Sequence, residues 1–114
     1  MAAADCLFCK IASGEIPSKK VHEDEHLVAF EDLHPRAPTH VLIVPREHVA
    51  SLAEAGEGQE AMIGRLFLAA ARIARQRGLD SFRTVVNAGA GAGQTVFHLH
   101  VHVLGGRTME WPPG

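Results

Sequence analysis

Three features of the sequence predict an α+β domain in which one long helix covers an antiparallel sheet. The segment 96–104, VFHLHVHVL, alternates apolar residues with histidines, and a period of two is typical of a half-buried strand. Residues 59–77 place apolar side chains at helical spacing, which predicts a long amphipathic helix. Short strand-like segments precede and follow this helix, and pairs of strands around an inserted helix favour an antiparallel sheet.

The other elements follow from local signals along the chain. Gly14 ends a short N-terminal helix, Pro45 ends a compact apolar strand, and Gly78 caps the long helix. The prolines of 32–39 and the glycines of 89–93 predict loops. In chain order, we expect a helix over 5–13, strands over 19–23, 26–31 and 40–44, a helical turn within 46–55, the helix over 59–77, and strands over 82–88 and 96–104.

The composition is that of an ordinary globular domain. A chain of 114 residues, 46% hydrophobic and 21% charged, is long enough to bury a core without disulfides. Its formal net charge of -2 argues against nucleic acid as a general partner. No apolar run approaches the roughly 20 residues that cross a bilayer, and the N-terminus lacks the basic and apolar regions of a secretory signal. We therefore expect a single domain over 1–114 that is cytoplasmic and binds neither nucleic acid nor membranes.

His98, His100 and His102 share one face of the expected strand over 96–104. Histidine gains little from a half-buried sheet surface, so packing alone is a poor reason for three of them in register. A solvated face is one interpretation; the functional one is a site that needs several groups titrating near neutrality. The opposite face is apolar and suits a core, since it carries Phe97, Leu99, Val101 and Val103.

The glycine-rich segment 89–93, GAGAG, leads into this strand through Gln94 and Thr95. Free N–H groups of such a loop can bind an anion such as phosphate, although most glycine-rich loops are only turns. Neither a Walker sequence nor a dinucleotide-binding G-x-G-x-x-G is present. A neutral imidazole is a good nucleophile toward phosphorus, and neighbouring imidazoles can hold its tautomer and move protons. Together these residues indicate a phosphate site with a histidine nucleophile.

Cys6 and Cys9 form a C-x-x-C pair near the N-terminus. Disulfides are uncommon in the cytosol, and no strand precedes Cys6 as a thioredoxin-like motif requires. The pair could supply half of a tetrahedral zinc site that histidines complete. The alternative is two reduced thiols that pack as small hydrophobic residues.

The sequence HLHVHVL resembles the H-φ-H-φ-H-φ-φ pattern of the histidine-triad (HIT) superfamily of nucleotide hydrolases and transferases. The resemblance extends through GEIPSK, AFEDLHPRAPTHVLIVPREH, VVNAG, GQTVFHLHVHVLGGR and WPPG, and the combination looks like the Hint branch, the nucleoside phosphoramidate hydrolases. It implies the HIT fold, a five-stranded antiparallel sheet with one long and one or two short helices, whose sheets join across a homodimer. It also implies that the long helix and the strand over 82–88 form the interface. The tail 105–114 would reach the partner's active site, where Trp111 would shape leaving-group selectivity.

The same resemblance implies a role for each site residue. His100 would attack the α-phosphorus of a purine nucleoside phosphoramidate and carry the nucleotidyl group, while its second ring nitrogen bonds the carbonyl of His98. His102 would contact the phosphate and the leaving group, His40 would lie behind the site as a fourth histidine, and Asp32 would accept hydrogen bonds from the ribose hydroxyls. An apolar slot for the base would be formed by Phe8, Ile11, Ile16, Phe30 and Leu33. Ribose and phosphate would be held by Asn87, Gly93, Gln94 and Thr95.

Two features depart from the best-known Hint proteins. Thr95 stands where those proteins often carry serine, so we expect an altered rate or selectivity and not a loss of activity. The C-x-x-C pair resembles bacterial-type HIT proteins that bind a structural zinc and need no cofactor for catalysis. That resemblance implies a closed site with the ligands Cys6, Cys9, His48 and His98.

Three other interpretations stay open. A dinucleoside polyphosphate hydrolase of the same superfamily would share the site, although the short chain and the WPPG tail favour Hint. A nucleotide-binding regulatory protein could use the same pocket. A metalloenzyme could use His98, His100 and His102 as ligands, but residues two apart on a strand are separated by about 6.6 Å, so all three fit one ion poorly.

Overall fold

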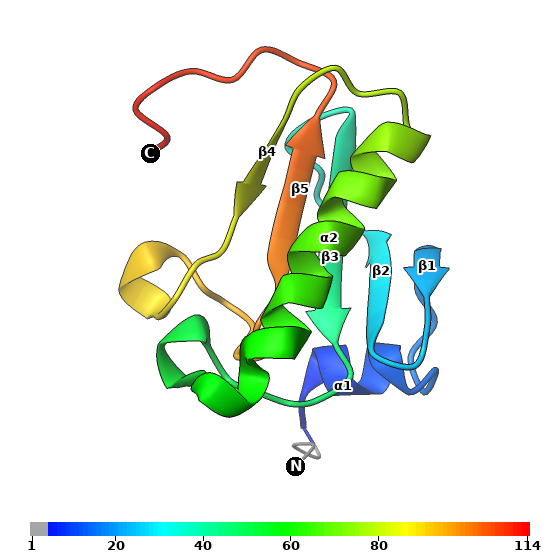
Figure 1. The fold of residues 1–114 in the computed structure, drawn as a ribbon, viewed down its shortest axis with the longest axis vertical. Coiled ribbons are helices and arrows are strands. Elements are labelled where there is room, and N and C mark those ends of the chain that lie inside the picture. Colours follow the sequence, from blue (N-terminus) through cyan, green and yellow to red (C-terminus); the bar gives the residue numbers. More distant parts are fainter. Residues whose placement is uncertain (1–4) are drawn as a thin grey trace.

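The computed structural model describes residues 5–114 and contains one five-stranded antiparallel sheet with the strand order β1-β2-β3-β5-β4 (Figure 1). The expected α+β class and the antiparallel sheet are confirmed. The strands are β1 (Lys20–Glu23), β2 (Leu27–Glu31), β3 (Thr39–Pro45), β4 (Phe82–Val85) and β5 (Val101–Gly105). The helices are α1 (Leu7–Ala12) and α2 (Glu60–Gln76), with short 3-10 turns at Leu52–Glu54, Glu57–Gln59 and Ala90–Ala92.

The sheet carries a helix on each face, because its central strands are apolar on both sides. The core under α2 is built from alternate residues of the sheet, including Ala29, Ile43 and Val101. The core under α1 is built from the residues between them, including Val28, Phe30 and Leu42. His102 is paired with Leu42 in the β3–β5 register, and paired residues point to the same face. The side chain of His102 therefore lies on the face that α1 covers.

The histidine segment is only partly a strand, which corrects the expectation for 96–104. β5 begins at Val101, and the five residues before it lie outside the ladder. The N–H of Leu99 donates instead to the carbonyl of Val49 at 2.7 Å. Phe97 is 48% exposed and was wrongly expected in the core. The other apolar residues of this segment are buried as expected: Leu99, Val101 and Val103.

The remaining elements follow the sequence, with two shorter than expected. The strand expected over 82–88 ends at Val85, which is the last residue of β4 that pairs with β5. The helical turn expected within 46–55 is confined to Leu52–Glu54. None of the helices in the described part of the chain has the length and apolarity needed to cross a membrane.

The C-terminal tail leaves β5 and runs beyond β4 at the edge of the sheet (Figure 1). The guanidinium of Arg83 donates to the carbonyl of Glu110 at 2.8 Å and lies 6.0 Å from the centre of the Trp111 ring. Trp111 is 81% exposed and does not line the cavity described below. A role for Trp111 in the active site of a partner stays a prediction.

Candidate active site and metal centre

His100 is held in one tautomer by the backbone. Its Nδ1 lies 2.7 Å from the carbonyl oxygen of His98, and because a carbonyl only accepts, Nδ1 carries the ring proton. The lone pair of the neutral ring is therefore on Nε2. The ring of Phe8 packs edge-on against it, with the two centroids 5.0 Å apart. This is the geometry expected of a histidine nucleophile.

A second chain of hydrogen bonds ends at His102. The backbone N–H of Arg36 donates to Nδ1 of His40 at 3.0 Å, so the proton of a neutral His40 is on Nε2. That nitrogen lies 3.0 Å from Nδ1 of His102 and 3.3 Å from Oδ2 of Asp32. Donation to His102 leaves the His102 proton on its own Nε2. The ring centroids of His100 and His102 are 5.0 Å apart, so a nucleophilic lone pair and a proton donor are neighbours.

His100, His102 and Asp32 line a cavity of about 360 Å³ between α1 and the sheet, and His40 is not part of its lining. Its volume is in the range of sites for small molecules and cofactors. One part of the wall is apolar, and the polar part includes Asp32, His100 and His102. The wall includes these expected site residues: Phe8, Ile11, Ile16, Phe30, Asp32, Leu33, Thr95, His100 and His102.

Three residues expected to hold ribose and phosphate do not line this cavity: Asn87, Gly93 and Gln94. The buried amide of Gln94 donates to two backbone carbonyls and accepts from the N–H of Gly89, so this side chain supports the loop. Asn87 lies beside Gly93, which has a φ of +101°. Sequence reasoning missed part of the wall, because only the fold brings these residues to the cavity: Leu7, Pro17, Ser18, Lys19, Glu31, His34, Leu42 and Val96.

The loop over 89–93 is not an open anion-binding nest. The N–H groups of Gly89, Ala92, Gly93 and Gln94 all bond acceptors within residues 89–94. The expectation of free N–H groups is therefore wrong at these four positions. The 3-10 turn uses the N–H groups of Ala92 and Gly93, and those of Gly89 and Gln94 bond between these two residues.

Burial keeps the site histidines neutral. It lowers the pKa of His100 and of His40 below the usual value for histidine. Burial also lowers the pKa of His102 to about 4, and the neighbouring His100 and His40 add to this effect. At neutral pH, His100 therefore keeps its lone pair and His102 keeps a single ring proton.

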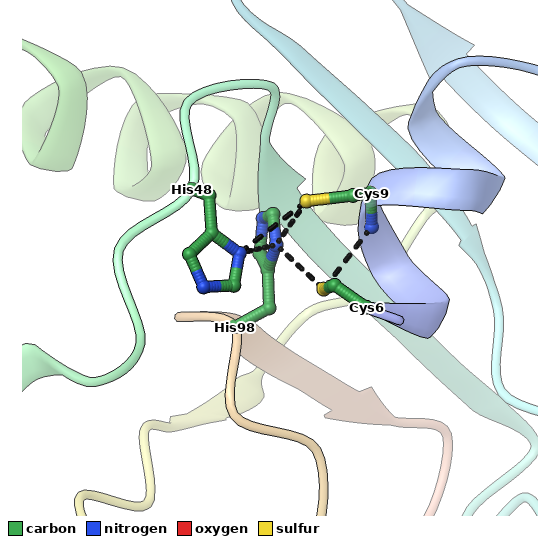
Figure 2. A group of neighbouring side chains, drawn as sticks. All are labelled: Cys6, Cys9, His48 and His98. Atoms are coloured by element: carbon green, nitrogen blue, oxygen red, sulfur yellow. Dashed lines mark hydrogen bonds between the residues drawn. The ribbon is translucent and has the colours of Figure 1, made fainter. Parts of the chain in front are cut away.

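Figure 2 shows a second group, the metal cluster, in which Cys6 and Cys9 approach His48 and His98. Nδ1 of His98 lies 3.3 Å from Sγ of Cys6 and 3.4 Å from Sγ of Cys9. Nδ1 of His48 lies 3.3 Å from Sγ of Cys9 and 3.2 Å from Nδ1 of His98. In a tetrahedron built from typical Zn–S and Zn–N bonds, the N–N and N–S edges are about 3.3–3.6 Å long. The donor set and its spacing thus fit a tetrahedral metal ion, at the four residues that the resemblance implied.

The far nitrogen of His98 prepares this ring to be a ligand. Nε2 donates to the carbonyl of Pro45 at 2.8 Å, which leaves the lone pair on Nδ1, facing the thiols. Burial lowers the pKa of His98 to about 4, so the ring is neutral. The side chain does not line the cavity, and a catalytic role for this ring, alongside His100, His102 and His40, stays a prediction. The hydrogen bond between these two residues runs from the His100 ring to the carbonyl of His98.

Asp32, His40 and His102 also place three possible ligand atoms close together. The hydrogen bond on the far side of His40 argues against a metal ion there. Nδ1 of His40 accepts the N–H of Arg36, so Nε2 carries a proton and has no lone pair to offer. The three side chains are therefore arranged for hydrogen bonding and not for metal binding. Together with His100 they are called the catalytic cluster, after the role proposed for them below.

Comparison with known proteins places this site in a family. A family model described as HIT domain matches residues 13–109. The chain is 48% identical over 111 residues to an uncharacterized HIT-like protein of Synechococcus elongatus, covering 96% of this chain and 97% of that protein. It is also 48% identical over 111 residues to a 14 kDa zinc-binding protein of Zea mays, covering 95% and 87%. The solved structure of a HIT family hydrolase from Legionella pneumophila is 45% identical and has a TM-score of 0.95, covering 96% of this chain and 100% of that chain. The chain therefore belongs to the HIT domain family.

Proposed function

We propose that this chain is a hydrolase of the Hint branch that cleaves the P–N bond of purine nucleoside 5′-phosphoramidates. The observation that carries the proposal is the hydrogen bond from Nδ1 of His100 to the carbonyl of His98, which reserves the Nε2 lone pair for a cavity that His100 lines. The similarity to a HIT family hydrolase from Legionella pneumophila supports hydrolysis as the reaction class.

Nε2 of His100 attacks the α-phosphorus, the P–N bond breaks, and the nucleotidyl group is transferred to the imidazole. This step consumes one proton, which becomes an N–H of the leaving amine. Solvent water supplies this proton, and His102 keeps its Nε2–H and donates it as a hydrogen bond to the phosphate or the leaving group. Water then attacks the phosphorus, the bond to His100 breaks, and one proton is released with the nucleoside monophosphate.

The cavity suits a purine nucleotide. Its apolar wall, which includes Phe8, Ile11 and Phe30, offers a slot for a flat base. Asp32 lies at the polar side of the cavity, where its carboxylate can accept hydrogen bonds from ribose hydroxyls.

We also propose that zinc occupies the metal cluster in a structural role. Four protein ligands complete a tetrahedral site and leave no open position for substrate, which is typical of structural zinc. The similarity to a maize protein named as zinc-binding supports this choice of metal.

A homodimer is the assembly we propose, with α2 and β4 at the interface. Both elements expose large apolar side chains, which a partner would cover. These are Phe67 and Leu68 on α2 and Phe82 on β4. The exposed Trp111 of each tail would then be available to the partner's active site.

The test measures AMP release from adenosine 5′-phosphoramidate by wild type and by His100→Asn, with and without a chelator. Loss of the nucleophile should slow turnover by roughly 10³-fold or more. Wild type with chelator should stay well above this variant. If the chelator lowers the folded wild type to the level of His100→Asn, the metalloenzyme interpretation is right.

Two further outcomes decide between the remaining alternatives. Turnover of a dinucleoside polyphosphate without turnover of any phosphoramidate would favour the other hydrolase class of the superfamily. Nucleotide binding without turnover of either substrate would favour a regulatory protein.

A further inference from the structure

The metal cluster and the nucleophile meet in one residue, His98. Nδ1 of its ring lies 3.3 Å from Sγ of Cys6, and its carbonyl oxygen accepts a hydrogen bond from Nδ1–H of His100 at 2.7 Å. We propose that a metal ion in the cluster positions the catalytic nucleophile in addition to stabilising the fold. Cys6, Cys9 and His48 are then positioning residues for His100. This inference rests on the function and the metal site proposed above.

The peptide unit between His98 and Leu99 is fixed at both polar ends. Its carbonyl accepts from His100, and its N–H donates to the carbonyl of Val49 at 2.7 Å. Val49 directly follows His48, so this one peptide unit is joined to both histidine ligands. A metal ion that fixes the two ligand rings therefore also fixes the carbonyl that selects the tautomer of His100.

Strand pairing does not hold the carbonyl of His98 in place. β5 begins at Val101, so His98 and His100 both precede the ladder that holds the rest of the segment. Ligation is the constraint that acts on the side chain of His98, together with its hydrogen bond to the carbonyl of Pro45. Without the metal ion, the contacts that join these four side chains to one another would be hydrogen bonds, which are weaker than coordination bonds.

The short helix α1 provides a second connection. Its six residues are too few for an isolated helix to be stable in water, so α1 depends on tertiary contacts. Cys6 caps its first turn, Cys9 lies in that turn, and both reach the metal cluster (Figure 2). Phe8, between them, packs edge-on against His98 at 6.2 Å and His100 at 5.0 Å between centroids. Ligation of the two thiols thus also fixes the side of the cavity that touches the nucleophile.

The test compares zinc-loaded full-length protein with chelated protein at a temperature where circular dichroism shows both folded. The ¹⁵N chemical shifts of the His100 ring report its tautomer without any substrate. We expect one tautomer, with the proton on Nδ1, in the loaded protein and a mixture after chelation. The kcat for adenosine 5′-phosphoramidate should fall at least tenfold, stay well above that of His100→Asn, and recover when Zn²⁺ is returned.

The matched control is Ile73→Val, which weakens the core under α2 without touching the metal cluster. Its His100 tautomer and kcat should be those of wild type, which separates positioning from a general loss of stability. Chelated protein with unchanged His100 shifts would overturn the inference and leave the metal ion a purely structural role.

If chelation unfolds the chain, the His48→Gln variant is measured in place of the chelated protein, because this variant keeps the other three ligands. Weaker zinc binding with an unchanged His100 tautomer would then overturn the inference. If the His100 tautomer changes in a protein that shows no turnover, the proposed hydrolysis is wrong, but the coupling between the metal ion and the His100 tautomer is supported.

Discussion

The metal cluster and the catalytic cluster both bring imidazole nitrogens within about 3 Å of each other but prepare them for different chemistry. In the first, two Nδ1 atoms are 3.2 Å apart; in the second, Nε2 of His40 and Nδ1 of His102 are 3.0 Å apart. The far nitrogen of His98 donates to the carbonyl of Pro45, so a lone pair faces its neighbours. The far nitrogen of His40 accepts the N–H of Arg36, so a proton faces its neighbours. One backbone group behind the ring therefore decides whether a histidine is a ligand or a donor.

Cys9→Ala should break the metal cluster with the largest effect on stability. Removal of one of four ligands leaves an incomplete site, and structural zinc contributes its binding free energy directly to folding. We expect zinc content to fall from stoichiometric to undetectable by atomic absorption and Tm to fall by at least ~10 °C. Lys10→Ala, on the same helix but outside the cluster, should change neither quantity. A Cys9→Ala protein with the zinc content and Tm of wild type contradicts the assignment.

Arg36→Pro should alter the catalytic cluster while sparing the metal cluster. Proline removes the N–H that fixes the tautomer of His40, whereas Arg36→Ala keeps it. We expect kcat to fall about 10–100-fold in the proline variant and to change little in the alanine variant. Ring ¹⁵N shifts of His40 and His102 should show a second tautomer only with proline. Equal activity and equal spectra in the two variants, at unchanged zinc content, would show that this N–H does not set the tautomer.

Acid should destabilise the fold through the catalytic cluster. Burial lowers the pKa of His102 to about 4, whereas an unfolded chain titrates near the usual 6.5. The neutral ring therefore stabilises the fold fully above pH 6.5, and this contribution is lost as pH falls from 6.5 toward 4. With metal removed from both proteins, we expect the loss of stability between pH 7 and pH 5 to be smaller for His102→Asn, by on the order of 1 kcal/mol. Identical pH slopes for the two proteins would contradict the lowered pKa.

Thr95→Ser should have the smallest effect, although this residue lies between the two clusters. Thr95 lines both the proposed nucleotide cavity and a neighbouring cavity that reaches Cys6 and His48. Serine keeps the hydroxyl and removes one methyl group, so kcat/KM should change by less than about fivefold. Thr95→Val keeps the volume and removes the hydroxyl. If valine lowers kcat/KM more than serine does, the hydroxyl oxygen is the part of Thr95 that supports catalysis. If serine lowers kcat/KM more than valine does, the methyl group is that part.

Much of the fold could be predicted because side-chain periodicity reports burial. The spacing over 59–77 located α2, and apolar segments located β2 and β3. The alternation over 96–104 continues through residues that leave the ladder, because Leu99 is buried whether or not its backbone pairs with a neighbouring strand. The sequence pattern therefore could not show where β5 begins.

The sequence could predict the parts of the site that are formed by side chains with a recognisable pattern, but not the parts formed by the backbone. The alternating histidines were conspicuous, whereas His48, a single histidine in a loop, entered through the family resemblance alone. The groups that divide the two clusters in function are peptide N–H and C=O groups, at Arg36 and Pro45. Such groups are present at nearly every position of any chain, so no sequence pattern distinguishes the ones that matter.

The hydrogen bond from Arg36 to His40 also couples the protonation state of His102 to the conformation of the loop over 32–39. A second proton on His102 would place its Nδ1–H against the Nε2–H of His40, and two donors cannot bond each other. Charging one ring therefore requires the other to turn or the bond to Arg36 to break. Because the segment 32–39 carries both Arg36 and Asp32, which lines the cavity, protonation of His102 in acid would displace this loop and change the shape of the cavity.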